Sequence, residues 1–241
     1  MDTRPHVSLV LLAAASGAVD ALAFTALGET FAGVMTGNLV LLGISAGQGS
    51  GPEVAGPLFA LGGYAVGAAL TALVCRKVRT DRTELWPGRV VVCLAAQCGL
   101  LCLLAVAGGL LGGDPAGVWR TVLLVTAALA MGGQSAAMVA AGAGGAPTTY
   151  FTGTLTTLVT GAVDGSGRRR EQLWVIGRLL AVVGGAACAV ALREAAAPWG
   201  FVPPAVLTAA AVACQKPAHR MRRAVTVLRK KTLPHTSTAR R

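Results

Sequence analysis

The sequence predicts an all-α polytopic membrane protein with about six transmembrane helices and two short re-entrant half-helices, arranged as two inverted repeats. Three observations lead to this fold class: scarce charge, a series of long apolar runs, and a polar phrase that occurs twice. Only 13% of the 241 residues are charged and 54% are hydrophobic, whereas soluble domains carry about 25% charged residues. So little polar surface indicates that most of the chain faces lipid rather than water.

Six apolar runs approach the length of about 20 residues with which a helix crosses about 30 Å of hydrocarbon. In chain order they cover roughly residues 7–27, 58–75, 90–111, 119–141, 173–192 and 199–214. The first run follows a single arginine in the manner of a signal peptide, but Asp20 interrupts the region where cleavage would occur. We therefore expect this run to remain as the first span.

The polar phrase links two distant parts of the chain. Met35-Thr36-Gly37-Asn38-Leu39 returns as Phe151-Thr152-Gly153-Thr154-Leu155, 116 positions later. The segment from Leu58 resembles the segment from Leu173, and Ser16 to Asp20 stands about where Gly132 to Ser135 stands in the second copy. This order predicts one membrane domain over residues 1–215, built from the related halves 1–112 and 113–215, and a basic tail over 216–241.

Each copy of the phrase opens a short apolar segment, over residues 36–47 and 152–163. Twelve helical residues extend about 18 Å, which is too short to cross the membrane alone. If both segments crossed nevertheless, the basic clusters at 76–89 and 168–170 would lie on opposite faces. If both segments enter and return on the same side, these clusters and the tail are all cytoplasmic, as the positive-inside rule favours.

The second arrangement inverts the two halves relative to each other. It places both termini in the cytoplasm and brings the two short helices in from opposite faces of the membrane. Inverted repeats with interrupted helices that meet near the midplane are typical of transporters. The small-residue pairs Gly33/Gly37, Gly43/Gly47 and Gly63/Gly67 have the spacing that lets membrane helices approach closely.

The net charge of +11 is concentrated in loops and in the tail. Nine basic and no acidic residues follow Gln215, a distribution typical of orientation signals and of contact with anionic lipids. We expect a partly disordered tail on the membrane surface and no nucleic-acid partner. Homo-oligomer formation is a further expectation that the sequence allows.

Asp20 is the one acidic residue well inside an apolar run. An ionised carboxylate in lipid is costly, so Asp20 is interpreted as a proton or cation site, with a structural hydrogen bond or a neutral acid as the alternative. Gln134 and Ser135 occupy the corresponding place in the second half. Arg178, inside the run from 173, is expected to reach toward the headgroups; pairing with Asp20 or binding of an anion is the alternative.

The remaining candidate residues stand where the two short helices begin. Free N–H groups at a helix start attract a carboxylate, a halide or a substrate oxygen, whereas simple helix capping by threonine is the structural alternative. These candidate substrate-binding residues are Thr36, Gly37, Asn38, Thr152, Gly153 and Thr154.

Signals for an enzyme or for a metal site are poor. Residues 43–47 match G-x-S-x-G, but that motif needs a histidine partner, and His6, His219 and His235 all lie outside the apolar runs. The six cysteines have a spacing that fits neither zinc nor a disulfide framework. We therefore predict no catalytic activity, no cofactor and no metal, and we interpret the cysteines as small apolar residues.

The stretches "SGAVDALAFTALGETFAGVMTGNLVLLG" and "GGQSAAM…TTYFTGTLTTL" resemble the YoaK-type family of bacterial membrane proteins, a domain of unknown function. The resemblance covers most of residues 7–215 and is carried by Gly17 and Asp20, by the phrase at 35–38, by Gly133-Gln134 and by the second Thr-Gly phrase. Ser135 stands where we expect asparagine in the family. The resemblance implies a bacterial inner-membrane protein of about six spans and implies no particular substrate.

Together these patterns predict a transporter or channel for a small solute or ion, with a carrier coupled to protons through Asp20 favoured over an open channel. The alternative is a non-transporting membrane scaffold or sensor that binds partner proteins through its glycine-rich faces and its basic tail.

Overall fold

The computed structural model describes residues 4–49, 51–76, 86–142, 151–164 and 169–215. Within these residues the chain is helical and contains no strand. Seven α-helices are followed by a 3-10 turn that continues into a last helix over residues 202–215, called the C-terminal helix below. Their bounds are α1 Arg4–Ala26, α2 Met35–Gln48, α3 Gly51–Cys75, α4 Gly88–Leu110, α5 Gly117–Ala140, α6 Thr152–Val163, α7 Arg169–Ala195 and η2 Ala197–Phe201.

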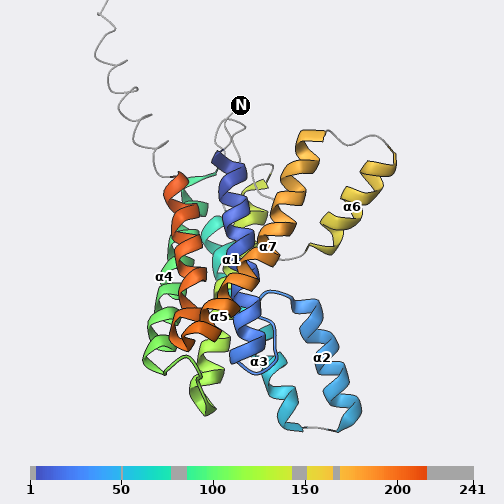
Figure 1. The fold of residues 1–241 in the computed structure, drawn as a ribbon. Helices are drawn as coiled ribbons and strands as arrows, with labels where there is room; N and C mark the ends of the chain where they lie inside the picture. Colours follow the sequence, from blue (N-terminus) through green and yellow to red (C-terminus); the bar gives the residue numbers. More distant parts are fainter. Residues whose placement is uncertain (1–3, 50, 77–85, 143–150, 165–168, 216–241) are drawn as a thin grey trace, which may run out of the picture.

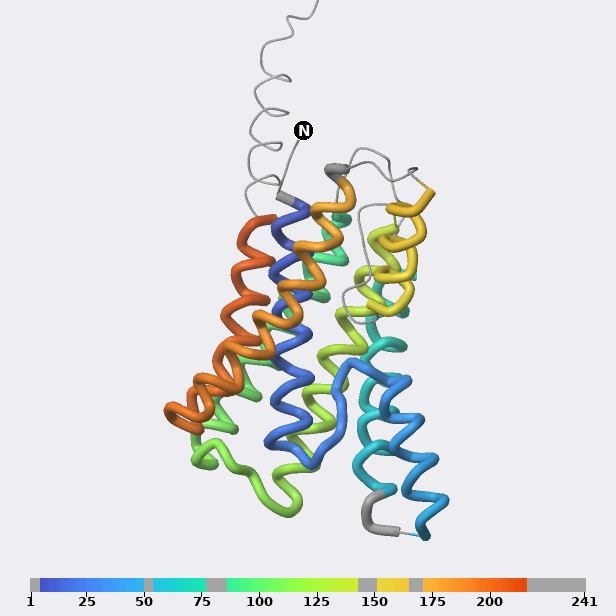
Figure 2. The backbone as a smooth tube through the Cα atoms, turned by 45° about the vertical axis from the view of Figure 1, so that its right-hand side comes forward, coloured from blue at the N-terminus to red at the C-terminus, as the bar shows by residue number. Residues whose placement is uncertain are grey.

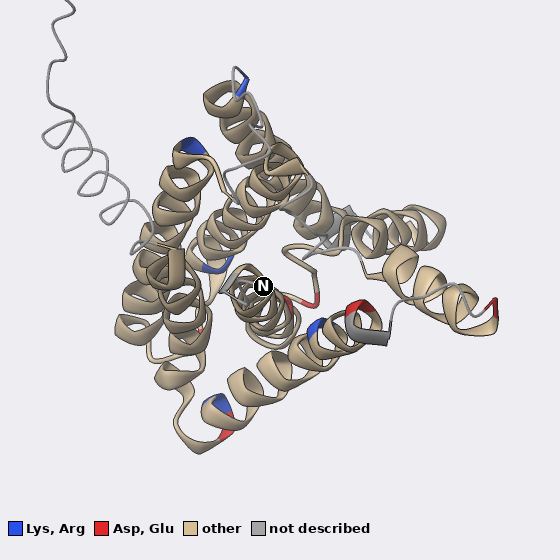
Figure 3. Ribbon diagram, turned by 90° about the horizontal axis from the view of Figure 1, so that it is seen from above, with Lys and Arg blue, Asp and Glu red and all other residues tan. Residues whose placement is uncertain are grey.

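In the described part of the chain six helices are long and apolar enough to cross a membrane, which confirms the predicted number of spans. They cover Pro5–Ala26, Val54–Cys75, Gly88–Leu110, Gly117–Ala140, Glu171–Ala195 and Ala197–Gln215. Each boundary lies within a few residues of the corresponding apolar run, because the run length and the flanking polar residues define where a helix can be covered by lipid. Charged residues are sparse along the described helices (Figure 3).

The six long helices form a bundle in which successive spans alternate in direction (Figure 1). The N-terminal end of α1 lies near the middle of the molecule when the bundle is viewed from above (Figure 3). α1 packs most extensively against α7, and α3 against α5. Each of these pairs joins a helix of the first half to a helix of the second half, so the two halves are interleaved rather than side by side.

Polar contacts tie the two ends of the bundle. At one end, the Ser8 hydroxyl donates to the Ala211 carbonyl at 3.1 Å and accepts from Gln215 Nε2 at 3.0 Å. At the other end, Arg193 Nη2 forms an ion pair with Asp114 at 3.3 Å. The start of α1 is therefore held beside the end of the C-terminal helix.

The two short helices lie on the same side of the bundle but extend to opposite ends (Figures 1 and 2). Each begins near the middle of the bundle; α2 then runs toward the end where α1 stops, and α6 toward the end where α1 starts. α2 has 14 residues and α6 has 12, or about 21 and 18 Å of helix. Their bounds match the predicted segments 36–47 and 152–163 closely.

Glycines form the seams between the paired helices, since an added Cβ at four of them would collide with a facing backbone carbonyl. Gly17 of α1 meets Val182 of α7, and Gly185 of α7 meets Ala14 of α1. Gly132 of α5 meets Tyr64 of α3, and Gly67 of α3 meets Leu129 of α5. In lipid such close backbone approach is a main source of helix association.

The predicted small-residue pairs fare differently. Gly63 and Gly67 both face α5, as expected. Gly33 precedes α2 instead of lying in a helix, and Gly43 and Gly47 have no atom within contact distance of an added Cβ. The spacing rule failed at the first pair because Gly33 lies outside a helix, and at the second because the rule does not distinguish a helix face that meets another helix from one that does not.

The core consists of two hydrophobic clusters, with buried polar side chains between them. Along α4, Leu101 belongs to one cluster and Leu94 to the other, and Gln97 lies between them. Along α5, Gln134 has the same intermediate place. Ser16, Gln97, Gln134 and Thr208 are all at most 3% exposed, so a polar layer crosses the interior of the bundle.

Candidate functional site

The carboxylate of Asp20 holds the backbone segment that leads into α2. Its Oδ1 accepts hydrogen bonds from the amides of Ala32 at 2.9 Å and Gly33 at 2.6 Å. Gly33 is suited to this position because a Cβ there would press against the second carboxylate oxygen. The turn that brings the chain back is built at Gly28 and Glu29, which both have positive φ. Asp20 is thus partly buried and bonded to backbone rather than exposed to lipid.

Asn38 closes the same segment from the other side. Its side chain is fully buried; Nδ2 donates to the Phe31 carbonyl at 2.6 Å, and Oδ1 accepts from the Phe31 amide at 2.9 Å. The Phe31 ring stacks on Phe24 of α1, with ring centroids 5.2 Å apart. Asp20 and Asn38 therefore act on one loop, which links α1 to the start of α2.

In the first phrase the Met35 amide donates to the Gly33 carbonyl of this loop at 3.1 Å, whereas the Thr36 side chain forms no hydrogen bond with it. Thr36 is exposed, and Gly37 lies against the Phe31 ring. The N-cap of α2 is Val34, with no hydrogen bond from a side chain. Helix capping by threonine, the structural alternative for the repeated phrase, is therefore not what Thr36 does.

The second phrase opens α6 in a more exposed setting. The N-cap is Phe151, again without a side-chain hydrogen bond. Thr152 and Gly153 are exposed and Thr154 is half-buried. The carbonyls of Thr152 and Gly153 accept from the hydroxyls of Thr156 and Thr157. α6 has no fully buried residue.

Gln134 and Ser135 are adjacent on α5 but lie in different surroundings, the first in the polar layer and the second at a pocket. Gln134 joins the polar layer: Gln97 Nε2 donates to Gln134 Oε1 at 2.6 Å, and Gln134 Nε2 donates to the Leu12 carbonyl of α1 at 3.3 Å. Gln97 Oε1 and the Thr208 hydroxyl, both buried, have no hydrogen-bond partner in the described part of the chain. The sequence analysis did not predict a role for Gln97. Its position as a polar residue inside the apolar run 90–111 was the signal that could have indicated one.

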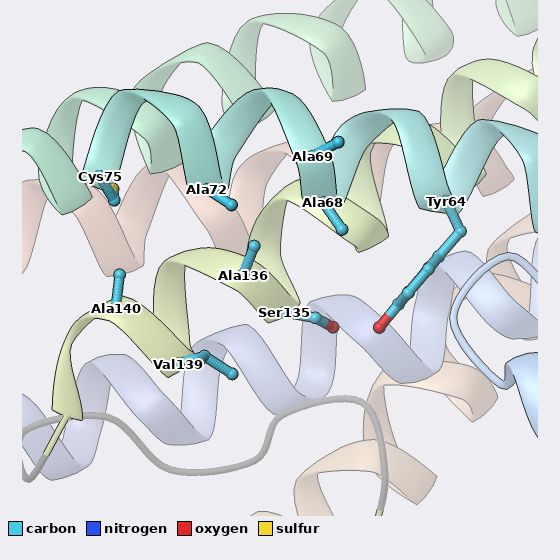
Figure 4. A pocket seen from close by; sticks show the side chains of 9 residues that line it. All are labelled: Tyr64, Ala68, Ala69, Ala72, Cys75, Ser135, Ala136, Val139 and Ala140. Atoms are coloured by element: carbon cyan, nitrogen blue, oxygen red, sulfur yellow. The ribbon is translucent and has the colours of Figure 1, made fainter.

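Ser135 lines a pocket of about 540 Å³ between α3 and α5. Figure 4 shows its hydroxyl turned toward the hydroxyl of Tyr64, while the rest of the wall is apolar. The lining residues are Tyr64, Ala68, Ala69, Ala72, Cys75, Ser135, Ala136, Val139 and Ala140.

Arg178 lies on α7 and is half-buried. Its Nη1 is buried without a hydrogen-bond partner among the described residues, and no ion pair joins it to Asp20 there. By these contacts the predicted residues are placed in the loop before α2, in the polar layer with its neighbouring pocket, at the start of α6 and, for Arg178, on α7.

Comparison with known proteins agrees with this architecture. A family model described as "Protein of unknown function (DUF1275)" matches residues 8–214. The chain is 34% identical over 160 residues to the UPF0700 transmembrane protein YoaK of Bacillus subtilis (strain 168), an alignment that covers 66% of this chain and 67% of that relative. No solved structure matches.

Proposed function

We propose that this chain, which belongs to the family of proteins of unknown function DUF1275, transports a small solute or ion across the bacterial inner membrane. Transport would be coupled to protons through Asp20. The family was predicted from the repeated phrases, and the chain is a multi-pass membrane protein. In this proposal the two halves are inverted repeats, and α2 and α6 are re-entrant half-helices. Both termini face the cytoplasm.

The observation that carries the proposal is the agreement between glycine contacts of the two halves. Gly17 meets the carbonyl of Val182, and Gly132 meets the carbonyl of Tyr64. The two glycines are 115 positions apart in the sequence, and the two carbonyl residues are 118 positions apart. The reciprocal contacts are those of Gly185 with Ala14 and of Gly67 with Leu129. Here too the glycines are 118 positions apart and their partners are 115 positions apart. These equal shifts support the proposal that one two-fold operation exchanges α1 with α5 and α3 with α7.

This operation supports an inverted relation, because α1 and α5 run in opposite directions through the bundle (Figure 1). The contacts relate α3 to α7 by 118 positions. Aligning the segments that begin at Leu58 and Leu173 gives 115 positions instead, three fewer. Under the same operation Asp20 corresponds to Ser135, also 115 positions later. The two halves thus place an acid and a hydroxyl at equivalent positions.

The short helices support re-entry. Each is too short to span about 30 Å of hydrocarbon, and each begins in the middle of the bundle and runs to a different end (Figure 1). A helix that starts at the midplane leaves its first N–H groups without intrahelical partners, a feature of the interrupted helices that bind substrate in transporters. The candidate binding residues of both phrases stand at these two starts.

The bonds of Asp20 suggest how a proton would act. As a carboxylate, Asp20 accepts from the Ala32 and Gly33 amides and holds the loop before α2. A protonated carboxyl group is a weaker acceptor, since charge-assisted hydrogen bonds are about twice as strong as neutral ones. Proton binding would therefore loosen this loop and free the start of α2.

A proton-flux assay tests the proposal. Inverted membrane vesicles containing the protein would be energised, and the pH gradient followed with acridine orange while amino acids, sugars, carboxylates and inorganic ions are added one class at a time. We expect one class to dissipate the gradient with the unmutated protein and not with Asp20→Asn. If no class does so in vesicles where the protein is shown to be folded, the proton-coupled carrier is wrong and the scaffold alternative is favoured.

A further inference from the structure

Two cysteines from neighbouring helices meet inside the bundle. Cys75 ends α3, Cys93 lies one turn into α4, and their sulfur atoms are 3.9 Å apart. Cys75 is 7% exposed, and Cys93 packs against the same hydrophobic cluster. The exposed Cys102 and Cys188 have no cysteine partner in the described part of the chain. Sequence spacing could not reveal this pair, since its members lie 18 positions apart on two different helices.

The sulfur separation suits a bridging metal ion. A disulfide requires about 2.05 Å between sulfurs, so the two side chains would have to approach by nearly 2 Å. Two metal–thiolate bonds of about 2.3 Å each place the sulfurs about 4.6 Å apart in the linear arrangement of a two-coordinate ion, so the two side chains would have to move apart by less than 1 Å from the observed 3.9 Å. The pair is therefore spaced to share one ion without a change in the backbone.

The surroundings limit the kind of ion. Within the described residues no group of three or more histidine, cysteine or acidic side chains surrounds a common point, so a four-ligand zinc site is not available from them. Thiolates select soft ions such as Cu(I), which binds with few ligands. The charge balance also fits, because Cu(I) with two thiolates carries one negative charge, and Arg89 lies close by: its Nη1 donates to the carbonyl of Val74, the residue before Cys75, at 3.1 Å.

The pocket between α3 and α5 offers an approach, because Cys75 forms part of its wall (Figure 4). We propose that Cys75 and Cys93 form a binding site for a soft, thiophilic metal ion of low coordination number, Cu(I). On binding, each thiol loses its proton to the solvent and forms one sulfur–copper bond, with no change in oxidation state. The site lies apart from Asp20 and Asn38 and does not depend on the transport proposal.

Copper retention by the full-length protein in detergent tests the site. The reduced protein would be loaded with Cu(I) without oxygen, then dialysed against the Cu(I) chelator bathocuproine disulfonate, and the copper remaining per chain measured. We expect the unmutated protein to retain one Cu(I) per chain, and Cys75→Ser and Cys93→Ser each to retain less than a tenth of that. The matched controls Cys102→Ser and Cys188→Ser should retain as much as the unmutated protein.

Two outcomes overturn the proposal: equal retention in Cys75→Ser, Cys93→Ser and the controls, or a mass two hydrogens lower than expected, which would indicate a disulfide. Because a serine variant can fail to fold, each variant is first checked for an unchanged elution volume and melting temperature. Cys93→Met supplies a second check, since a thioether still binds Cu(I). Its copper retention should lie between that of the unmutated protein and that of Cys93→Ser, and loss equal to the serine variant counts against the site.

Discussion

Asp20 Oδ1 accepts a hydrogen bond of 2.6 Å from the amide of Gly33, thirteen residues further along the chain. With the second bond, from the Ala32 amide, this contact joins the middle of α1 to the entry of α2. The acidic residue in the first span is thus a structural anchor as well as the candidate for proton coupling, and substitutions can separate the two roles.

Asp20→Ala removes the acceptor of two backbone amides, whereas Asp20→Asn keeps a carbonyl oxygen there. We expect Asp20→Ala to lower the free energy of unfolding by about 1.5–3 kcal/mol, the usual worth of a hydrogen bond to a charged group, and Asp20→Asn by clearly less. Tryptophan fluorescence during thermal unfolding in detergent measures both. Equal losses would mean that the charge, not the acceptor, stabilises the loop.

Asn38→Leu should destabilise the same loop. It leaves the amide and carbonyl of Phe31 without their partner, and a buried unsatisfied group costs about 1–3 kcal/mol. Thr36→Val is the matched control, because Thr36 is exposed two positions away. Limited proteolysis of the α1–α2 connection should accelerate in the first variant only; similar rates in both would contradict a specific role of Asn38.

Alanine at the seam glycines should separate the paired helices. Gly67→Ala and Gly185→Ala would push a methyl group into the Leu129 and Ala14 carbonyls, and overpacking of this kind costs about 1–3 kcal/mol. Gly62→Ala and Gly184→Ala, on the same helices, have open space and should leave the melting temperature unchanged or slightly raised.

The proposed two-fold relation between the halves adds a quantitative expectation to these measurements. Equivalent contacts should respond alike, so Gly17→Ala should cost about as much as Gly132→Ala, and Gly67→Ala about as much as Gly185→Ala. A large loss at one member of each pair and none at the other would contradict the repeat.

The glutamine pair should show strong coupling. Gln134→Leu leaves Gln97 Nε2 buried without its acceptor, while the double variant Gln97→Leu/Gln134→Leu removes both polar groups. Replacing both partners can be nearly neutral where removal of one costs about 1–3 kcal/mol. A double-mutant cycle of unfolding free energies checks this; additive losses would mean that the two side chains do not interact.

Thiol labelling tests the inverted arrangement. Gln48 and Asp164 are exposed at the far ends of α2 and α6. In a background without the six native cysteines, intact cells treated with an impermeant thiol reagent should label Gln48→Cys and not Asp164→Cys, because in the proposed arrangement the two short helices return to opposite faces. Labelling of both from the outside would refute the inversion.

The spans were predictable because lipid imposes a length and a composition on every crossing helix. The ends of α2 and α6 were predictable too, since glycine and polar residues bound both apolar segments. The partners of Asp20 were not, because backbone amides of a loop leave no mark in a sequence. The pairing of α1 with α7 was equally invisible, since hydrophobic periodicity reports that a face is covered and not which helix covers it.

The seams of α1 also determine the order in which this protein can assemble during synthesis. The amides that bond to Asp20 lie only 12 and 13 residues downstream. These hydrogen bonds can therefore form early, once the segment before α2 has been synthesised. Ser8, by contrast, bonds to a carbonyl 203 residues away. Gly17 packs against Val182 of α7, which is also synthesised much later. During synthesis α1 therefore stays incompletely packed until α7 and the C-terminal helix have been made, and a chain that stops before α7 lacks the partner of the α1 glycine face.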